Sequence, residues 1–397
     1  MGATHKSDDV RRARPGEGAA PMTLRFESGE PDATVFAFYY LWYGNPSTDG
    51  RWLHWNHSVL PHWTPAVNER YPNVGNSHDP PEHIHARFYP RRGTYSVAYP
   101  PTLNAQMSEL KAAGVDTVVL SWWGRPELSS GDSQGIGTDS KIEGVLVAAA
   151  AVGISVAWHL EPYHGRSAAS FREDIRYLTR KYGDHEALLR RPAPGDSGRD
   201  GPVYFVYDSY HIPAADWAEV LGLAGAGSLR GTEDDGTFIG LWLEANHGAD
   251  LAAGHFDGAY TYFASEGFSW GSSLHNWPSI RRWAEERSKL FVASVGPGYD
   301  DTGIRPWNAH NTKDREKGKY YRRMWEAAIQ HEVDMVSITS YNEWGEGTQI
   351  EPAVRKTGYE DPGDDPNFYL QLTADYADEL RRRRREQRKQ REQREEL

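Results

Sequence analysis

One stretch of the chain joins a predicted strand to a pair of carboxylates: Met335-Val336-Ser337-Ile338-Thr339-Ser340-Tyr341-Asn342-Glu343-Trp344-Gly345-Glu346-Gly347. The apolar first half is typical of a buried strand, and the glycines allow a tight turn to carry Glu343 and Glu346 off its end. Carboxylates set against an indole and other apolar surface give proteins an acid and a base near neutral pH. A solvated loop is the commoner fate of two such glutamates, so their surroundings must decide.

Apolar runs like this one recur along the chain, with helix-like stretches between them. The predicted strands are Val35–Tyr40, Thr117–Trp122, Ile154–Leu160, Val203–Tyr207, Phe238–Leu243, Gly258–Tyr262, Leu290–Ser294 and Met335–Tyr341. The predicted helices are Leu103–Ala113, Lys141–Val152, Phe171–Tyr182, Trp217–Leu223, Ser279–Arg287 and Tyr320–His331. Continuous apolar strands that alternate with helices predict a parallel sheet buried on both faces. Eight of them indicate a single (β/α)8 TIM-type barrel with elaborated βα loops; a doubly wound open sheet is the alternative.

Polar and aromatic residues gather where the predicted strands end. They are Tyr39–Asn45, Ser121–Trp123, His159–Tyr163, Tyr207–Tyr210, Glu244, Tyr260–Tyr262, Arg305–Asn308, and Glu343 with Glu346. In a barrel, catalytic groups lie at the carboxyl ends of the strands. Solvated loops are rarely so rich in Trp and Tyr, so this convergence favours an active site over a polar surface.

The aromatic composition points to the type of ligand. The chain has 15 Trp and 22 Tyr against 12 Phe. Core packing alone would use Phe more freely, because buried Trp and Tyr each need a polar partner. Amphipathic rings suit surfaces that stack on sugar faces while they hydrogen-bond hydroxyl groups, although an aromatic-rich core accounts for part of the excess.

Charge and cysteine content exclude several classes of function. The net charge is -12, of which residues 381–397 carry +5 and the rest -17. An acidic body argues against a nucleic-acid partner. The absence of cysteine excludes disulfides, thiolate metal sites and cysteine nucleophiles. We find no membrane span and no signal peptide, so the chain as written is expected in the cytoplasm, or outside the cell if a leader was trimmed.

The chain divides into three predicted parts. Residues 1–31 are polar and rich in Gly and Pro, which predicts a disordered N-terminal segment. Residues 32–380 form the barrel domain. Residues 381–397 are a charged tail of Arg, Glu and Gln, expected to extend the preceding helix into solvent. We expect a monomer.

The order of the motifs resembles glycoside hydrolase family 99, the endo-α-mannosidases and endo-α-1,2-mannanases. The matching blocks are Tyr39–Asn45, Trp55–His57, Phe88–Pro90, Glu161–Tyr163, Tyr204–Tyr210, Phe256–Gly258, Tyr260–Phe263, Ser294–Tyr299, Ile304–Asn308 and Asn342–Glu351. They run in order through nearly the whole predicted barrel, and it is their succession that is specific. The resemblance implies a barrel that cleaves inside α-mannoside oligosaccharides or polysaccharides with retention of configuration, without metal or organic cofactor.

The resemblance also implies roles for individual residues. Glu346 matches the general acid/base that protonates the departing oxygen. Glu343 matches the base that deprotonates the 2-hydroxyl, so that O2 attacks C1 and forms a 1,2-anhydro sugar. The axial O2 of an α-mannoside lies anti to the axial leaving group, so the nucleophile is already in place. Two glutamates on one loop need not face each other across the bond, as retaining enzymes with a carboxylate nucleophile require.

The residues expected to bind substrate come from several loops. Glu161 is expected to hydrogen-bond sugar hydroxyls, and the other candidates are Tyr40, Tyr43, Tyr207, Tyr262, Arg305 and Asn342. The family carries Tyr in animal members and Trp in bacterial, mannan-acting members at the position matched by Trp123. This indole implies a preference for mannose over glucose beyond the cleaved sugar, hence an α-1,2-mannan or α-mannosyl oligosaccharide substrate.

Two other functions remain open from the sequence. One is a polysaccharide-assembly enzyme on the same scaffold, and the other is a glycan-binding protein without catalysis. Retention of both Glu343 and Glu346 argues against the second, since a binding module has no need of a perturbed carboxylate pair.

His83-Ile84-His85 has the spacing of two metal ligands, but no acidic residue follows it at a recognisable spacing, which predicts a surface loop.

Overall fold

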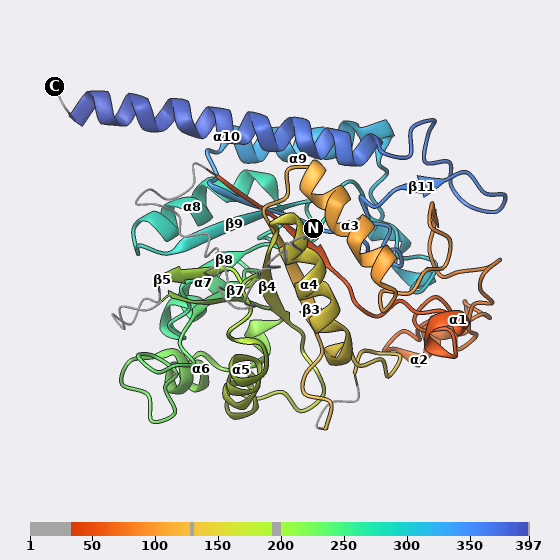
Figure 1. Ribbon diagram of the computed structural model, residues 1–397, viewed down its shortest axis with the longest axis horizontal. Helices are drawn as coiled ribbons and strands as arrows, with labels where there is room; N and C mark the ends of the chain where they lie inside the picture. The colour runs from red at the N-terminus through yellow and green to blue at the C-terminus, as the bar shows by residue number, and fades with distance from the viewer. Residues whose placement is uncertain (1–32, 128–130, 193–199, 396–397) are drawn as a thin grey trace, which may run out of the picture. The chain divides into compact units, whose positions relative to one another are not determined.

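The computed structural model describes residues 33–127, 131–192 and 200–395, and its centre is a closed parallel barrel (Figure 1). Eight strands form the ring: β1 Thr34–Tyr39, β3 Thr117–Trp122, β4 Ser155–Leu160, β6 Asp200–Val206, β7 Thr237–Leu241, β8 Gly258–Tyr260, β9 Leu290–Val295 and β10 Met335–Ile338. Each pairs in parallel with the next, and β1 pairs with β10 to close the ring. The short strand β5 (Arg190–Pro192) lies outside the ring and pairs antiparallel with β6. The predicted (β/α)8 barrel is confirmed.

A helix follows every strand of the ring. These helices are α3 Pro100–Ala112, α4 Ile142–Val152, α5 Ala168–Tyr182, α6 Ala214–Leu221, α7 His247–Ala253, α8 Trp277–Glu285, α9 Lys319–Gln330 and α10 Phe368–Glu395. The six helices predicted from the sequence are confirmed within a few residues. The helix α7 was not predicted, because its seven residues are too few to show a helical repeat.

Short elements decorate the loops. They are α1 Pro46–Asp49, α2 Pro65–Asn68, β2 Tyr89–Pro90, β5 Arg190–Pro192, β11 Ala353–Val354, and the 3-10 turns Asp139–Lys141, Ser209–His211, Leu274–Asn276, Pro306–Asn311 and Glu316–Gly318. The strand β2 pairs with β11 antiparallel, which ties the long loop after β1 to the loop after β10. The βα loops are thus elaborated as predicted, mostly on the side that carries the site.

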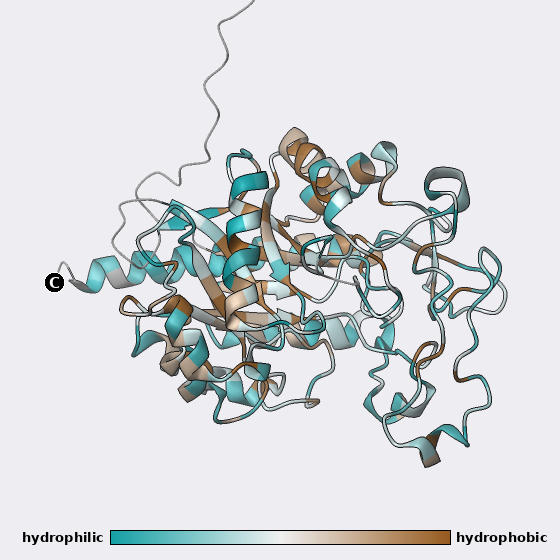
Figure 2. Ribbon diagram, turned by 90° about the horizontal axis from the view of Figure 1, so that it is seen from below, coloured by the Kyte–Doolittle hydropathy of each residue, from teal (hydrophilic) through white to brown (hydrophobic). Residues whose placement is uncertain are grey.

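Alternation along the strands fills the barrel with aromatic rings. Phe36 and Phe38 of β1 point inward, where the ring of Phe205 lies 5.4 Å from Phe36 and 5.8 Å from Phe38. Tyr39 points outward and donates its hydroxyl hydrogen bond to Gln106 of α3. Figure 2 shows apolar strands inside a layer of mostly polar helix surface. The interior is therefore a packed core, and the site lies above it at the carboxyl ends of the strands.

Three strands end two or three residues earlier than predicted. β8 ends at Tyr260, and Tyr262 has φ +54°, a left-handed conformation that a strand does not contain. β10 ends at Ile338, three residues before the predicted end, and β7 ends at Leu241.

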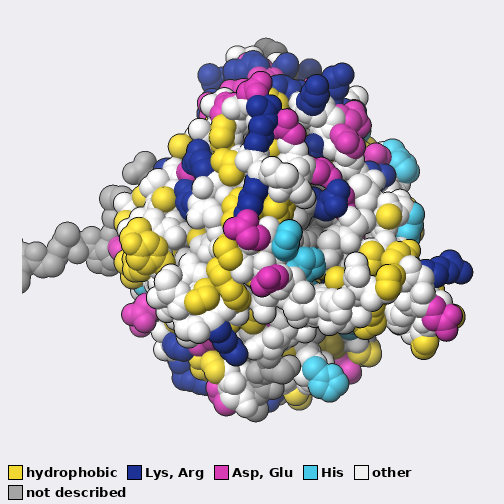
Figure 3. All heavy atoms as spheres, turned by 90° about the vertical axis from the view of Figure 1, so that its right-hand side faces the viewer, with side chains coloured by type: hydrophobic (Ala, Val, Ile, Leu, Met, Phe, Trp, Pro, Cys, Tyr) yellow, Lys and Arg dark blue, Asp and Glu magenta, His cyan; other side chains and the backbone are white. Residues whose placement is uncertain are grey.

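The helix α10 packs outside α3 and α9 and continues through the charged tail to Glu395 (Figure 1). Arg381 donates to both carboxylate oxygens of Asp116, at 2.9 and 2.8 Å, and so fastens the start of the tail to the barrel. Basic side chains gather at the upper edge of the face in Figure 3, where α10 lies.

The predicted disordered segment 1–31 lies outside the described residues. Within the described ranges, no helix has both the length and the apolar character needed to cross a membrane.

Candidate active site

The turn after β10 holds Glu343 in a buried, fixed position. The backbone N–H of Glu343 donates to Ser340 Oγ at 2.7 Å, and its Oε1 accepts from the N–H of Gly345 at 2.9 Å. A Cβ at Gly345 would lie 2.7 Å from Cδ2 of His85, so only glycine fits there. Burial raises the pKa of Glu343 well above its ordinary value, and the charge of Glu346 adds to the shift. This carboxylate is therefore a stronger base than a solvated glutamate.

Glu346 lies closer to solvent and beside a cation. Its side chain is 23% exposed, and its Oε1 lies 3.4 Å from Nη1 of Arg305. Burial raises the pKa of Glu346, while Arg305 opposes the rise. Arg305 is itself held by Asp301, whose Oδ2 lies 3.1 Å from the same nitrogen. The two glutamates of one loop thus have different surroundings, which is the condition for one to act as acid and the other as base.

Tyrosines from three strand ends form a wall beside the carboxylates. Tyr40 and Tyr262 are buried and hydrogen-bond each other through their hydroxyls. The half-buried ring of Tyr207 packs edge-on against Tyr262, with centroids 4.7 Å apart. Burial raises the pKa of all three, so they stay protonated and can donate to sugar oxygens.

Glu161 lies on the opposite side of the barrel mouth, in a chain of polar side chains. Its Oε1 accepts from Ser121 Oγ at 2.8 Å and faces Nδ1 of His159 at 2.9 Å. The other ring nitrogen of His159 lies 3.0 Å from the hydroxyl of Tyr260. Since these contacts all use one oxygen, the second oxygen of Glu161 remains for a ligand.

Asn342 and Tyr43 join the loop after β1 to the turn after β10. The Asn342 side chain accepts from the N–H of Tyr40 at 2.8 Å and donates to its carbonyl at 2.9 Å. The hydroxyl of Tyr43 accepts from the N–H of Trp344 at 3.0 Å. Asn342 and Tyr43 are fully buried, so these contacts favour a structural task over sugar binding. Trp123 is half-buried, and its ring lies 6.4 Å from that of Trp42, which stacks on Tyr40.

A cluster of histidines beside Glu343 was missed by the sequence analysis. His54 and His85 are buried, and His85 packs against Gly345, so the prediction of a surface loop at His83–His85 is wrong for His85. The loop that carries His85 packs against the turn after β10, and this contact buries the ring. His57 belongs to the same cluster, with its ring 4.9 Å from that of His54. In the sequence, this segment was marked only by Trp55–His57, one of the blocks that resemble glycoside hydrolase family 99.

An exposed tryptophan was also missed. Trp63 is 78% exposed, and its ring packs edge-on against Trp307 at 5.2 Å. The indole N–H of Trp307 donates to the carbonyl of Leu60 at 3.1 Å, which ties the two loops together. Trp307 follows Arg305 by two residues, so this aromatic pair adjoins the Glu346 side of the site.

A carboxylate pair among protonated tyrosines, one carboxylate buried and the other partly exposed, at the carboxyl end of a (β/α)8 barrel is the site of a glycoside hydrolase. The comparisons with known proteins agree, because the chain belongs to glycosyl hydrolase family 99, whose family model matches residues 31–382. The predicted family and the predicted enzyme class are confirmed.

The relatives include proteins of animals and bacteria. The chain is 41% identical to "Glycoprotein endo-alpha-1,2-mannosidase" of Rattus norvegicus, over 88% of this chain and 75% of the relative. It is 42% identical to "Glycoprotein endo-alpha-1,2-mannosidase-like protein" of Danio rerio, over 90% and 81%. A solved structure, the GH99 endo-alpha-mannosidase from Bacteroides thetaiotaomicron, superimposes with a TM-score of 0.79 at 40% identity, covering 89% of this chain and 98% of that one.

Proposed function

We propose that this chain is a retaining endo-α-mannosidase that hydrolyses internal α-1,2-mannosidic linkages in mannan or in mannosyl and glucosylmannosyl oligosaccharides. The observation that carries the proposal is the pair Glu343 and Glu346 on one loop, the first buried with a free oxygen and the second beside Arg305. The names of the animal and bacterial relatives support the same activity.

In the first step Glu343 removes the proton of the 2-hydroxyl, and O2 attacks C1 from the face opposite the leaving group. The bond from C1 to the glycosidic oxygen breaks, and protonated Glu346 gives its proton to that oxygen. The product is a 1,2-anhydro sugar with Glu343 protonated and Glu346 ionised. Burial raises the pKa of Glu343, so its ionised carboxylate is a stronger base toward an alcohol, while Arg305 opposes the rise at Glu346. The step needs Glu343 ionised and Glu346 protonated, so the two roles rest on the family resemblance and not on these pKa shifts.

In the second step a water molecule opens the anhydro ring. Glu346, now ionised, takes a proton from the water as its oxygen attacks C1, and the bond from C1 to O2 breaks. Glu343 returns its proton to O2, so both carboxyls regain their starting states. Two inversions at C1 give net retention, and no covalent bond to the protein forms.

The experiment that tests the proposal is product analysis by NMR. The substrates are an α-1,2-linked mannosyl oligosaccharide and its glucosylated counterpart. Internal cleavage with an α-configured initial product is expected, and the relative rates rank the two substrates. Release of single terminal sugars, or an initial β product, would overturn the proposal.

Trp123 is expected to set the preference for the sugar beyond the cleaved one. We predict that Trp123→Tyr raises the ratio of kcat/KM for the glucosylated over the mannosyl substrate by about tenfold, within the range that one pocket contact gives. The indole presents an apolar face, whereas a phenol hydroxyl can hydrogen-bond the equatorial 2-hydroxyl of glucose. Competition assays with both substrates in one tube measure the ratio directly. An unchanged ratio would assign the preference to other residues.

Trp63 is expected to bind sugar units on the leaving-group side, since its partner Trp307 adjoins Arg305 and Glu346. We predict that Trp63→Ala lowers kcat/KM on a long α-1,2-mannan chain roughly fivefold, the equivalent of about 1 kcal/mol for a lost aromatic contact. The shortest cleavable oligosaccharide should be unaffected. Leu223→Ala is the matched control, because Leu223 is 74% exposed and lies after α6. Equal losses on short and long substrates would contradict the prediction.

A further inference from the structure

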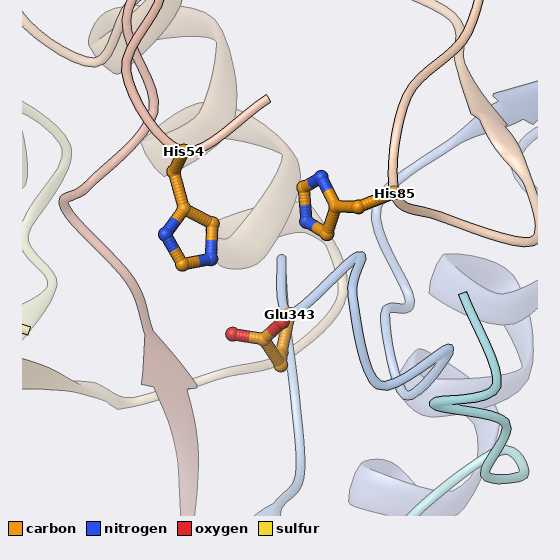
Figure 4. Close-up of side chains that lie close together, drawn as sticks. All are labelled: His54, His85 and Glu343. Carbon is orange, nitrogen blue, oxygen red and sulfur yellow. The ribbon is translucent and has the colours of Figure 1, made fainter. Parts of the chain in front are cut away.

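Three buried side chains from distant segments converge at the base of the active site. One ligand atom each from His54, His85 and Glu343 lies within 4.8 Å of the other two. Figure 4 shows the two imidazole rings on either side of a gap, with the Glu343 carboxylate beneath them. Two imidazoles and a carboxylate form a donor set that binds zinc and related divalent ions.

The hydrogen bonds of the rings leave the nitrogens that face the gap free to bind. Nδ1 of His54 lies 3.0 Å from Oδ2 of Asp132, and Nδ1 of His85 lies 3.3 Å from the carbonyl oxygen of Trp55. Both partners only accept, so each Nδ1 carries the hydrogen and each Nε2 keeps its lone pair. A carboxylate that orients a ring in this way is the usual support of a histidine ligand.

Asp132 is itself held in place. Its Oδ1 accepts from the N–H of Gln134 at 2.9 Å and from that of Ile136 at 2.8 Å. The orientation of the His54 ring is therefore fixed by backbone, as a preformed metal site requires.

The buried atoms that face the gap lack hydrogen-bond partners in the described structure. They are Nε2 of His85 and Oε2 of Glu343. An unpaired buried acceptor costs free energy, and a cation between the two would satisfy both. Burial also lowers the pKa of His54 and of His85, so that both rings stay neutral, the form that binds metals.

We propose that His54, His85 and Glu343 bind a divalent transition-metal ion of the zinc class, and that the bound ion inhibits the enzyme. The inhibition rests on the proposed function, because the ion occupies the carboxylate that must deprotonate the 2-hydroxyl. A tetrahedral ion with bonds of roughly 2.0–2.2 Å brings its ligand atoms about 3.3–3.6 Å apart. Rotation of the Glu343 side chain brings its free Oε2 closer to the two rings and so shortens the distances between the ligand atoms. The fourth coordination position of the ion is left for water.

Binding is tested without substrate, on the full chain after EDTA treatment and dialysis. Co²⁺ is titrated by visible absorption and Zn²⁺ by equilibrium dialysis. One ion per chain is expected, with the absorption of a four-coordinate Co²⁺ site. His85→Gln and His54→Gln should each weaken binding by at least 100-fold, and Asp132→Asn by about 10–100-fold.

The control variants are His57→Gln and His83→Gln. His57 lies in the same cluster but donates no atom to the group of three, and His83 is exposed. Both should bind the ion as the wild type does. Binding that fails in the wild type at millimolar ion, or that His57→Gln abolishes as fully as His85→Gln, would overturn the proposal.

A second arm separates this inference from the proposed function. Zn²⁺ added to EDTA-treated enzyme should inhibit cleavage of the mannosyl oligosaccharide at the concentration that fills the site, and EDTA should restore activity. Cleavage without any ion binding would overturn the proposed metal site and leave the proposed endo-mannosidase activity standing. Ion binding by a chain that cleaves neither substrate would remove the proposed function and the inhibitory role with it.

Discussion

Glu343→Gln is expected to lower kcat on the mannosyl oligosaccharide by about 10²–10⁴-fold, the usual contribution of a general base. Glutamine keeps the size and the acceptor that meets the N–H of Gly345, but it cannot take the proton of the 2-hydroxyl. Without that proton transfer O2 is a weak nucleophile, and no other carboxylate in the loop is placed to replace it. Initial rates at saturating substrate measure the loss.

A second variant distinguishes the base from the acid. Glu346→Gln should lose a similar factor on the oligosaccharide but much less on a mannosyl-mannosyl fluoride, whose leaving group needs no proton. Glu343→Gln should lose as much on the fluoride as on the oligosaccharide, since the 2-hydroxyl must still be deprotonated.

Folding of both variants is checked by thermal unfolding. Glutamine removes a buried carboxyl whose ionised form burial disfavours, so neither midpoint should fall appreciably. If Glu343→Gln retains activity within tenfold of the wild type, the anhydro-sugar route is wrong.

The barrel was predictable because its strands are buried on both faces. Each therefore appears in the sequence as a continuous apolar run, with polar and aromatic residues at its carboxyl end. The strand ends were less predictable. Tyr262 has strand-like sequence neighbours but a left-handed backbone, because its ring must turn into the site.

The carboxylate pair was predictable from its place after β10, but its supports were not. His54 and His85 lie far apart in the long loop after β1, and Asp132 lies in the loop after β3; they meet only in the folded chain, and no local pattern records that meeting. The histidine spacing at His83–His85 instead suggested a surface loop, because the burial of one histidine depends on how the long β1 loop folds.

The structural role of Glu351 could not be predicted from the sequence. It ends the matching block Asn342–Glu351, yet its hydrogen bonds are to residues that hold the turn in place. Its Oε1 accepts from Gln106 Nε2 at 2.7 Å and Arg92 Nη1 at 3.1 Å. Its Oε2 accepts from the Tyr95 hydroxyl at 2.7 Å and Trp344 Nε1 at 2.9 Å. Four donors from three segments thus anchor the turn that carries the catalytic pair.

Glu351→Ala is therefore expected to lower the free energy of unfolding by about 3–5 kcal/mol, the loss typical when one partner of a buried ionic network is removed. The four donors would be left buried without an acceptor. Glu360→Ala is the matched control. Glu360 pairs with Arg87 at 2.9 Å, but both side chains are more than 40% exposed, so its loss should be about 1 kcal/mol or less.

Denaturant unfolding of both variants measures the difference, and the activity of Glu351→Ala below its unfolding transition adds a second test. Because Trp344 lies between Glu343 and Glu346, a loosened indole should displace both carboxylates and lower kcat even in folded protein. Equal stability losses for the two variants would show that the network adds nothing beyond an exposed ion pair. A stability loss without any change in kcat would instead show that the turn keeps its geometry without this anchor.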